Sequence, residues 1–173
     1  VVRAMTHVKL LVALEDADPA ARDPFVAWAR EVAMHDATGR AEVEVVDEVA
    51  HAAHTRVPIR HVAFAWLWVS DARAAALVDE RPDATAWWLV RERLAFDRSA
   101  RPDEVRPWAG VKKTTPWAAV TGVETRVWQG RYTNHGWLAA AHHATCVRYR
   151  QNVVVDGSDR SVDAVSELWF TNV

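Results

Sequence analysis

Short apolar stretches alternate with helical periodicities in the first half of the chain. The predicted strands are residues 7–15, the segment around Val43 and Val45, residues 61–69 and residues 87–96. Asp23 and Pro24 predict the start of a helix that ends near Gly39, because aspartate is a favoured N-cap and proline fits the first helical position. A second, short helix is predicted over 72–79, with Asp71 as its N-cap. The order β-α-β-β-α-β is that of the ferredoxin-like fold.

The same kind of pattern starts again after a charged, proline-containing connection. The predicted strands of this second half are residues 111–117, 148–155 and 162–170. Thr121 and Glu124 have the spacing of a capping box, in which each side chain bonds the backbone N–H of the other. They predict a helix over 123–143. The second half therefore has the order β-α-β-β and lacks the closing helix and strand of the first.

We expect an α+β fold built from two ferredoxin-like halves. The first half covers residues 1–98, the connector 99–110 and the second half 111–173. The sheets of two such halves can pack face to face as a dimeric α+β barrel, here within one chain. Two separate small domains are the alternative, although each half is marginal in size for folding alone.

The composition is that of an ordinary globular protein. Half of the 173 residues are apolar, a quarter are charged and the formal net charge is −2. No excess of positive charge favours nucleic acid or an anionic membrane. The longest apolar run, residues 62–69, is too short to cross a bilayer, and a single cysteine excludes a disulfide framework. We therefore expect a cytoplasmic protein without nucleic-acid or membrane partners.

Tryptophan is unusually frequent, with 10 Trp against 4 Phe and 2 Tyr. An indole ring combines a large apolar area with an N–H that needs a partner when it is buried. Two interpretations follow. The tryptophans line a flat-walled apolar cavity, or they fill an aromatic core that has no cavity.

One face of the predicted helix in the second half is polar. Trp128, Tyr132, His135, Ala139 and His142 follow one another at steps of four, three, four and three, which places them on one stripe facing the sheet. Histidine titrates near neutrality and is the natural general acid or base, while tyrosine or asparagine can hold an enol or carbonyl oxygen. The alternative interpretation is a set of satisfied, half-buried residues at a helix–sheet seam.

Spacing argues against a metal or a cofactor. Adjacent His142 and His143 point about 100° apart on a helix, so they do not chelate one ion. The chain has no P-loop and no G-x-G-x-x-G motif for phosphate or dinucleotide binding. We expect no cofactor, and no metal unless His51, His54 or His61 approaches in space.

Residues 131–154 resemble the helix and following strand of EthD-domain proteins. The matching motifs are His135-Gly136-Trp137-Leu138-Ala139 and Arg148-Tyr149-Arg150-Gln151-Asn152. Residues 162–170 are similar to the DG-x-x-ELWF strand of that family, with Ala164 where glycine is usual. Residues 89–113 resemble the junction between two such units in tandem. The first half has no counterpart of R-Y-x-Q-N, which suggests a structural role for that half.

The resemblance implies a dimeric α+β barrel and an enzyme of small, often aromatic or polyketide-like molecules. We expect a cofactor-independent lyase, cyclase or isomerase that abstracts a proton next to a carbonyl of a hydrophobic substrate, followed by dehydration, decarboxylation or cyclisation. The alternatives are a cofactor-independent monooxygenase of a phenolic or anthrone-like substrate and a non-enzymatic small-molecule-binding protein. Exposed strand edges are compatible with a homodimer.

The candidate site lies in the second half. The candidate catalytic residues are His135, Tyr132, Asn134 and Arg131. The candidate substrate-binding residues are Trp128, Trp137, His142, Arg148, Asn152 and Trp169. His135 is the expected general base or acid, and Tyr132 with Asn134, or Asn152, would stabilise an enolate oxygen. Arg131 or Arg148 would hold a carboxylate or phenolate, with the tryptophans as walls that exclude water.

Overall fold

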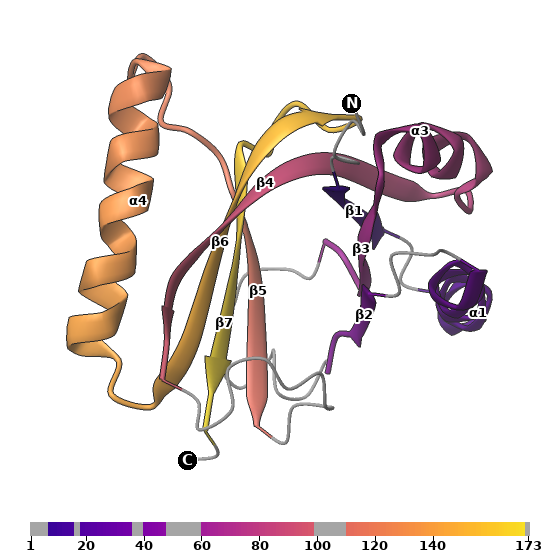
Figure 1. Ribbon diagram of the computed structural model, residues 1–173, viewed down its shortest axis with the longest axis horizontal. Helices are drawn as coiled ribbons and strands as arrows, with labels where there is room; N and C mark the ends of the chain where they lie inside the picture. The colour runs from indigo at the N-terminus through magenta and orange to yellow at the C-terminus, as the bar shows by residue number, and fades with distance from the viewer. Residues whose placement is uncertain (1–6, 16–17, 36–39, 48–59, 99–109, 172–173) are drawn as a thin grey trace, which may run out of the picture. The chain divides into compact units, whose positions relative to one another are not determined.

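The computed structural model describes residues 7–15, 18–35, 40–47, 60–98 and 110–171. Over these residues the chain forms three helices and seven strands, an α+β arrangement (Figure 1). The strands are β1 (His7–Leu14), β2 (Arg40–Val45), β3 (Ala63–Ser70), β4 (Thr85–Asp97), β5 (Val111–Trp117), β6 (Cys146–Gly157) and β7 (Ala164–Phe170). The helices are α1 (Pro19–His35), α3 (Asp71–Glu80) and α4 (Thr125–His142). His51, His54 and most of the predicted connector lie outside the described residues.

The strands lie where the apolar pattern predicts them. The bounds of β5 agree with the prediction residue for residue, and β6 extends beyond the predicted 148–155 at both ends. Among the described helices, none is long and apolar enough to cross a membrane.

The chain divides into two compact units. The first comprises residues 1–90 and 156–159, and the second comprises residues 91–155 and 160–173. Strand β4 passes from one to the other, so its first half belongs to the first unit and its second half to the second unit.

The first unit has the element order β1-α1-β2-β3-α3-β4. Its strands lie in the order β2-β3-β1-β4, and the pairs β2–β3, β1–β3 and β1–β4 are antiparallel. Both helices cover the same face of these strands (Figure 1), where alternate strand residues such as Leu10 and Val12 pack with Phe25 of α1 and Leu77 of α3. This covered face is the aliphatic core of the unit.

The second unit consists of β5, α4, β6, β7 and the end of β4, with the strand order β4-β6-β7-β5. Helix α4 lies along one face of these strands (Figure 1). Its buried positions are Trp128, Tyr132, Gly136 and Ala139. Their spacing of three and four residues confirms that a helical stripe faces the sheet. It differs from the predicted stripe in two positions: Gly136 is buried where His135 was expected, with His135 half-buried beside it, and His142 is exposed.

Helix α1 begins one turn before its predicted start. The Asp18 carboxylate accepts a hydrogen bond from the N–H of Ala20 at 2.9 Å, and Pro24 lies inside the helix. The predicted start at Asp23 is therefore wrong. The earlier Asp-Pro pair provides the same combination of N-cap acceptor and first-position proline.

The predicted caps of the other two helices also differ from the observed ones. Ser70, and not Asp71, caps α3, because the Ser70 hydroxyl accepts from the N–H of Arg73 at 3.3 Å. Glu124 is the N-cap of α4 and makes no side-chain cap hydrogen bond, so the predicted capping box with Thr121 is wrong. Gly122, at a φ of 82°, turns the chain between the predicted cap and the observed helix start.

Gly157, at the end of β6, is a position where the smallest substitution should destabilise the first unit. A Cβ atom there would lie 2.5 Å from Cδ1 of Trp88 and 2.7 Å from the backbone oxygen of Trp87. We expect Gly157→Ala to lower the free energy of unfolding by about 1–3 kcal/mol, since backbone cannot yield to the added methyl group. Urea denaturation measures this.

Gly130 of α4 is the matched control, because a Cβ there meets nothing within 4 Å. Gly130→Ala should raise the free energy of unfolding by up to about 1 kcal/mol through helix propensity. A Gly157→Ala protein as stable as the wild type would contradict the close packing at Trp88.

Candidate functional site

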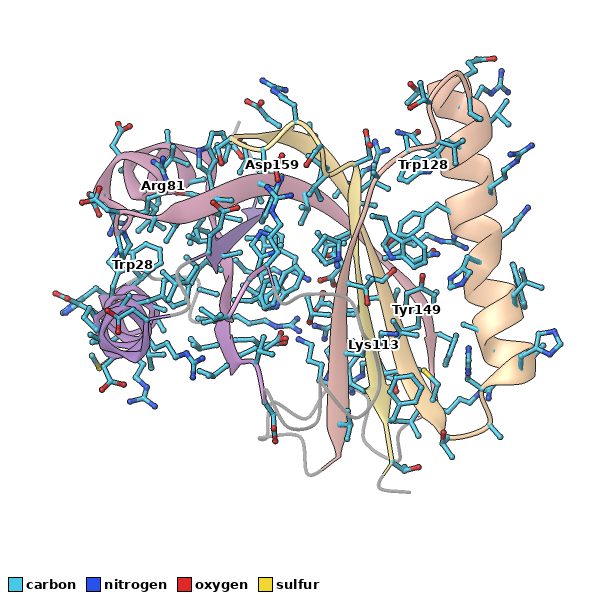
Figure 2. All side chains as sticks on the ribbon, turned by 180° about the vertical axis from the view of Figure 1, so that it is seen from behind. Trp28, Arg81, Lys113, Trp128, Tyr149 and Asp159 are labelled. Carbon is cyan, nitrogen blue, oxygen red and sulfur yellow. The ribbon has the colours of Figure 1, made fainter. Side chains whose placement is uncertain are left out.

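The side chains between α4 and the strands of the second unit form a connected set of hydrogen bonds. The hydroxyl of Ser166 on β7 lies 3.1 Å from that of Tyr132 and 2.9 Å from that of Tyr149, and it accepts from Nε1 of Trp117 at 2.9 Å. The Tyr149 hydroxyl lies 3.0 Å from Nδ1 of His135. Figure 2 shows Tyr149 in the layer between the strands and α4. We call these five residues the Ser166 network.

The donors and acceptors of the Ser166 network allow a continuous chain of hydrogen bonds from His135 to Tyr132. An indole N–H only donates, and a serine hydroxyl has one donor and two acceptor sites. If Nδ1 of His135 carries the ring proton, it donates to Tyr149, Tyr149 donates to Ser166, and Ser166 donates to Tyr132. This assignment leaves Nε2 of His135 with its lone pair.

His135 is the member of the network that is suited to proton transfer. Its ring lies 5.7 Å from the ring of Trp117 and 5.8 Å, edge-on, from that of Tyr149. Burial, and then the charge of His143, lower the pKa of His135 below its usual value. Within the described part of the chain, Nε2 makes no hydrogen bond. A half-buried, neutral imidazole with one committed and one available nitrogen has the properties of a general base.

The two tyrosines of the network stay protonated. Burial raises the pKa of both Tyr132 and Tyr149 above the usual value, although hydrogen bonds to Ser166 oppose the shift. Tyr132 also stacks on Trp128, with ring centroids 5.4 Å apart and an interplanar angle of 6°. Both phenols therefore act as neutral hydrogen-bonding groups that orient their neighbours.

Gln151 and Gly136 hold α4 close to the strands. The Gln151 amide donates to the backbone oxygen of Tyr132, and its Oε1 accepts from Arg93 at 3.2 Å. A Cβ atom on Gly136 would lie only 2.9 Å from Cβ of Ala95. Glycine at this position lets the helix approach β4, and that approach brings His135 within reach of Tyr149.

The structure separates the sequence-predicted site residues into three groups. Trp128, Tyr132 and His135 face the strands together. The predicted residues that lie on the exposed side of α4 are Arg131, Asn134, Trp137 and His142, and Trp137 is 74% exposed. Arg148, Asn152 and Trp169 alternate with Tyr149, Gln151 and Ser166 along β6 and β7, so they lie on the opposite face of the sheet. The structure therefore does not bring the ten predicted residues together in one site.

The sequence analysis assigned no role to Tyr149, Ser166, Trp117 or Gln151. Tyr149 and Gln151 stand in the R-Y-x-Q-N motif, and their two-residue spacing places them on one face of a strand. Ser166 and Trp117 carry no such signal. They join the site through pairing of β7 with β6 and β5, which brings together residues that are far apart in the sequence.

A row of three side chains occurs in both units, on the sheet face opposite the helices. The rows are Lys9–Trp68–Arg40 in the first unit and Lys112–Trp169–Arg148 in the second. The indole contacts the lysine at 4.7 Å and the arginine at 4.0 Å in the first unit, and at 4.4 Å and 5.5 Å in the second. This shared row aligns β1 with β5, β2 with β6 and β3 with β7.

The alignment shows which segment of the first half stands where the R-Y-x-Q-N motif stands in the second, and this segment lacks the motif, as expected. Residues 40–44 occupy the position of residues 148–152, and only the arginine is the same. On the helix-covered face, the first unit has the rows Leu10–Leu67–Ala41 and Val12–Ala65–Val43. The second unit has Lys113–Leu168–Tyr149 and Thr115–Ser166–Gln151 there. A helix therefore packs on an aliphatic surface in one unit and on the Ser166 network in the other.

The lowered pKa of His135 makes the stability of the protein depend on pH. Unfolded, the imidazole takes up a proton as the pH falls through about 6.5, whereas the folded protein does so only at lower pH. Between these two values the unfolded state binds more protons, so the free energy of unfolding decreases as the pH falls below 6.5.

An NMR titration of the His135 ring should give a midpoint below 6.5. His143→Gln should move the midpoint upward, and a wild-type midpoint at or above 6.5 would contradict the burial of the ring.

Comparison with known proteins adds no family assignment: no protein-family model matches the chain, and no curated protein sequence matches it. The likeness to EthD-domain proteins therefore stands on the motifs of residues 131–170, and it enters below as part of a proposal.

Proposed function

We propose that the chain is a cofactor-independent acid–base enzyme of a hydrophobic, oxygenated small molecule, with His135 as its catalytic base. The observation that carries this proposal is the difference between the two units. Aligned positions under the helix are aliphatic in the first unit and form the Ser166 network in the second. The packing of a helix on this kind of sheet does not need buried hydroxyl and amide groups, which are costly to desolvate unless each finds a partner.

The network gives His135 a defined role. Nε2 takes a proton from a carbon next to a carbonyl group, and the imidazolium that forms is held through Nδ1–H by the Tyr149 hydroxyl. Tyr149 acts as a positioning residue, because it fixes the ring orientation and the tautomer of His135. Trp117 supplies an apolar ring beside the imidazole. The enolate then expels a β-hydroxyl group, which takes the proton of the imidazolium and leaves as water, or it attacks a second carbonyl group of the substrate and closes a ring. With a β-keto acid as substrate, loss of carbon dioxide gives the enolate directly, and a protonated His135 returns a proton to its carbon.

The proposal treats the chain as a tandem EthD-like protein made of ferredoxin-like units, including the α+β barrel expected from the sequence. The strand order β2-β3-β1-β4 of the first unit supports it, because this is the antiparallel order of a ferredoxin-like sheet. The strand sequences Ala63–Ser70 and Ala164–Phe170 support it as well, since both contain Leu-Trp at aligned positions.

Proton abstraction by His135 can be tested before the natural substrate is identified. An aryl methyl ketone such as acetylnaphthalene exchanges its methyl protons slowly in heavy water, and mass spectrometry detects deuterium uptake. We expect the wild-type protein to accelerate this exchange. His135→Ala should reduce the acceleration by about 10²-fold or more, the usual contribution of a general base.

Two further variants sharpen the test. Tyr149→Phe should shift the pH profile of the exchange, because it removes the partner of Nδ1 and leaves the base in place. His35→Ala, which removes an exposed histidine of α1, is the matched control and should leave the rate unchanged. Exchange rates that are equal for the wild type and His135→Ala would refute the proposal. Saturable binding of the ketone without exchange would favour a binding protein.

A further inference from the structure

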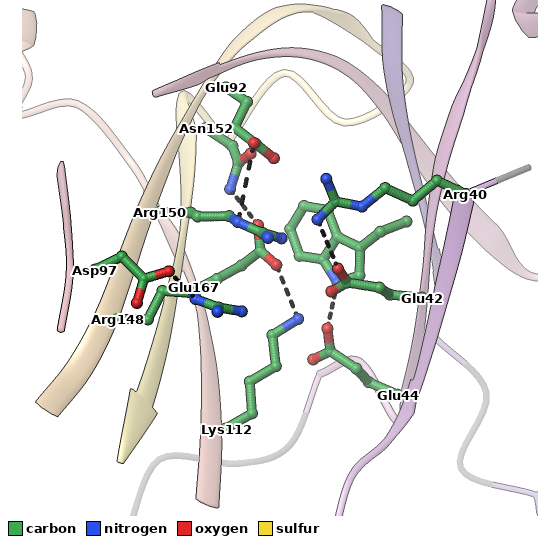
Figure 3. A network of polar contacts seen from close by, with 11 residues as sticks. Arg40, Glu42, Glu44, Glu92, Asp97, Lys112, Arg148, Arg150, Asn152 and Glu167 are labelled. Carbon is green, nitrogen blue, oxygen red and sulfur yellow. Dashed lines mark hydrogen bonds and ion pairs between the residues drawn. The ribbon is translucent and has the colours of Figure 1, made fainter. Parts of the chain in front are cut away.

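Two adjacent lysines of β5, Lys112 and Lys113, lie on opposite faces of the sheet of the second unit and have different surroundings. Nζ of Lys112 lies 2.8 Å from Oε1 of the buried Glu167. On the same face, Nε of Arg148 lies 2.7 Å from the Asp97 carboxylate (Figure 3). We call this face, which is opposite α4, the charged face. These ion pairs neutralise its cations within the protein.

Lys113 of β5 lies on the face that α4 covers (Figure 2). It is exposed and makes no ion pair or side-chain hydrogen bond within the described part of the chain. Lys113 pairs with Leu168, which pairs with Tyr149, so one row across the sheet contains all three residues. Two strand spacings, about 10 Å, separate the Cα atoms at its ends. An unpaired ammonium group therefore stands in the row of the residue that positions His135.

The two sides of α4 differ in how they meet the strands. On the side of β4, Arg93 and Arg98 donate to backbone oxygens of the helix at 3.3 and 2.8 Å. On the side of β5, the ring of Trp117 lies 5.7 Å from that of His135, and Trp117 remains 38% exposed. Solvent therefore reaches this end of the Ser166 network from the side of β5.

The charges on this side are positive. Arg131 precedes His135 by four residues, so it lies one turn away on the same side of α4. It is exposed and unpaired within the residues that the structure describes. The charge that acts on His135 is also positive, since His143 lowers its pKa together with burial. Such a distribution attracts an anion.

The first unit has no counterpart of this ammonium group. The aligned rows under the helices are Leu10–Leu67–Ala41 in the first unit and Lys113–Leu168–Tyr149 in the second. The central leucine is the same, while both ends of the row are polar in the second unit. Lysine on the last strand of a sheet also prevents pairing with another chain. That role needs neither an aromatic ring nor a base nearby.

We propose that the substrate of His135 is a flat keto acid whose carboxylate pairs with Lys113. This inference rests on the proposed function, since it names the substrate class of the same site. Lys113 and Trp117 share a face of β5 with about 13 Å between their Cα atoms, a span that one ring with a carboxylate fills together with the two side chains. The ring lies against Trp117, and the carbon that loses its proton lies at Nε2 of His135. A charge-assisted hydrogen bond to the ammonium group fixes the other end.

Two probes of the same shape test this inference. Both para-acetylbenzoate and para-acetylbenzamide carry an exchangeable methyl ketone, and they differ in charge. For deuterium exchange by the wild-type protein, we expect kcat/KM of the acid to exceed that of the amide about 3- to 10-fold, the range of a solvent-accessible ion pair. Salt should reduce this advantage, Lys113→Gln should remove it and Lys113→Arg should retain it.

Arg126→Gln is the matched control and should retain the preference for the acid. Arg126 is exposed on the same helix, nine residues before His135 and thus on the opposite side of α4, and its loss changes the net charge equally.

Shifts of the His135 ring resonances report binding of either probe without catalysis. Tighter binding of the acid that Lys113→Gln abolishes supports the inference, even if no exchange occurs and the proposed function fails. The inference is overturned, and the proposed function stands, if His135-dependent exchange occurs with equal kcat/KM for acid and amide. It is equally overturned if the acid shows no saturable binding, or if Lys113→Gln keeps the preference for it.

Discussion

The pairing register of β6 determines the chemistry of the second unit. Side chains alternate between the two faces of a strand, so Tyr149 and Gln151 face α4 while Arg148 and Arg150 face away from it. The register shifts between Cys146 and Arg148, and this irregularity decides which set meets the helix. A slip of one residue would bring guanidinium groups under α4 and remove the Tyr149 hydroxyl from His135. The Ser166 network and the charged face therefore depend on the same constraint.

Burial makes the two faces behave differently. Under α4 the hydroxyl groups remain neutral, since burial raises the pKa of Tyr132 and Tyr149 and lowers that of His135. His135 is then the member of the network whose protonation changes near neutral pH, and the others orient it. On the opposite face, charges of opposite sign neutralise one another, since the ammonium of Lys112 lies 2.8 Å from the Glu167 carboxylate. Hydrogen bonding between neutral groups governs one face, and ion pairing governs the other.

The sequence predicts the parts of this arrangement that are periodic. Strand positions follow from apolar alternation, and the stripe of Trp128, Tyr132 and His135 follows from helical spacing. The predicted helix starts differ from the observed ones where two Asp-Pro pairs, or two adjacent residues that can cap a helix, lie close together. The helix-capping preference of the residues alone does not show which of them begins the helix. The contacts of Ser166 with Trp117 and Tyr149 were not predictable, since they depend on pairing between strands distant in the sequence. Because the sequence does not show the strand register, Arg148 and His135 were predicted to lie in one site, although the sheet separates them.

The first unit serves as an internal reference for the second. The Lys–Trp–Arg row is common to both, and each cation–indole contact of this kind contributes about 0.5–2 kcal/mol, so the row is a property of the scaffold. The neighbouring rows differ on both faces of the sheet. Arg148 belongs to the shared row, and Arg150 occupies the position at which the first unit has Glu42, the ion-pair partner of Arg40. The second unit thus differs from the first mainly at residues next to a row that both units share.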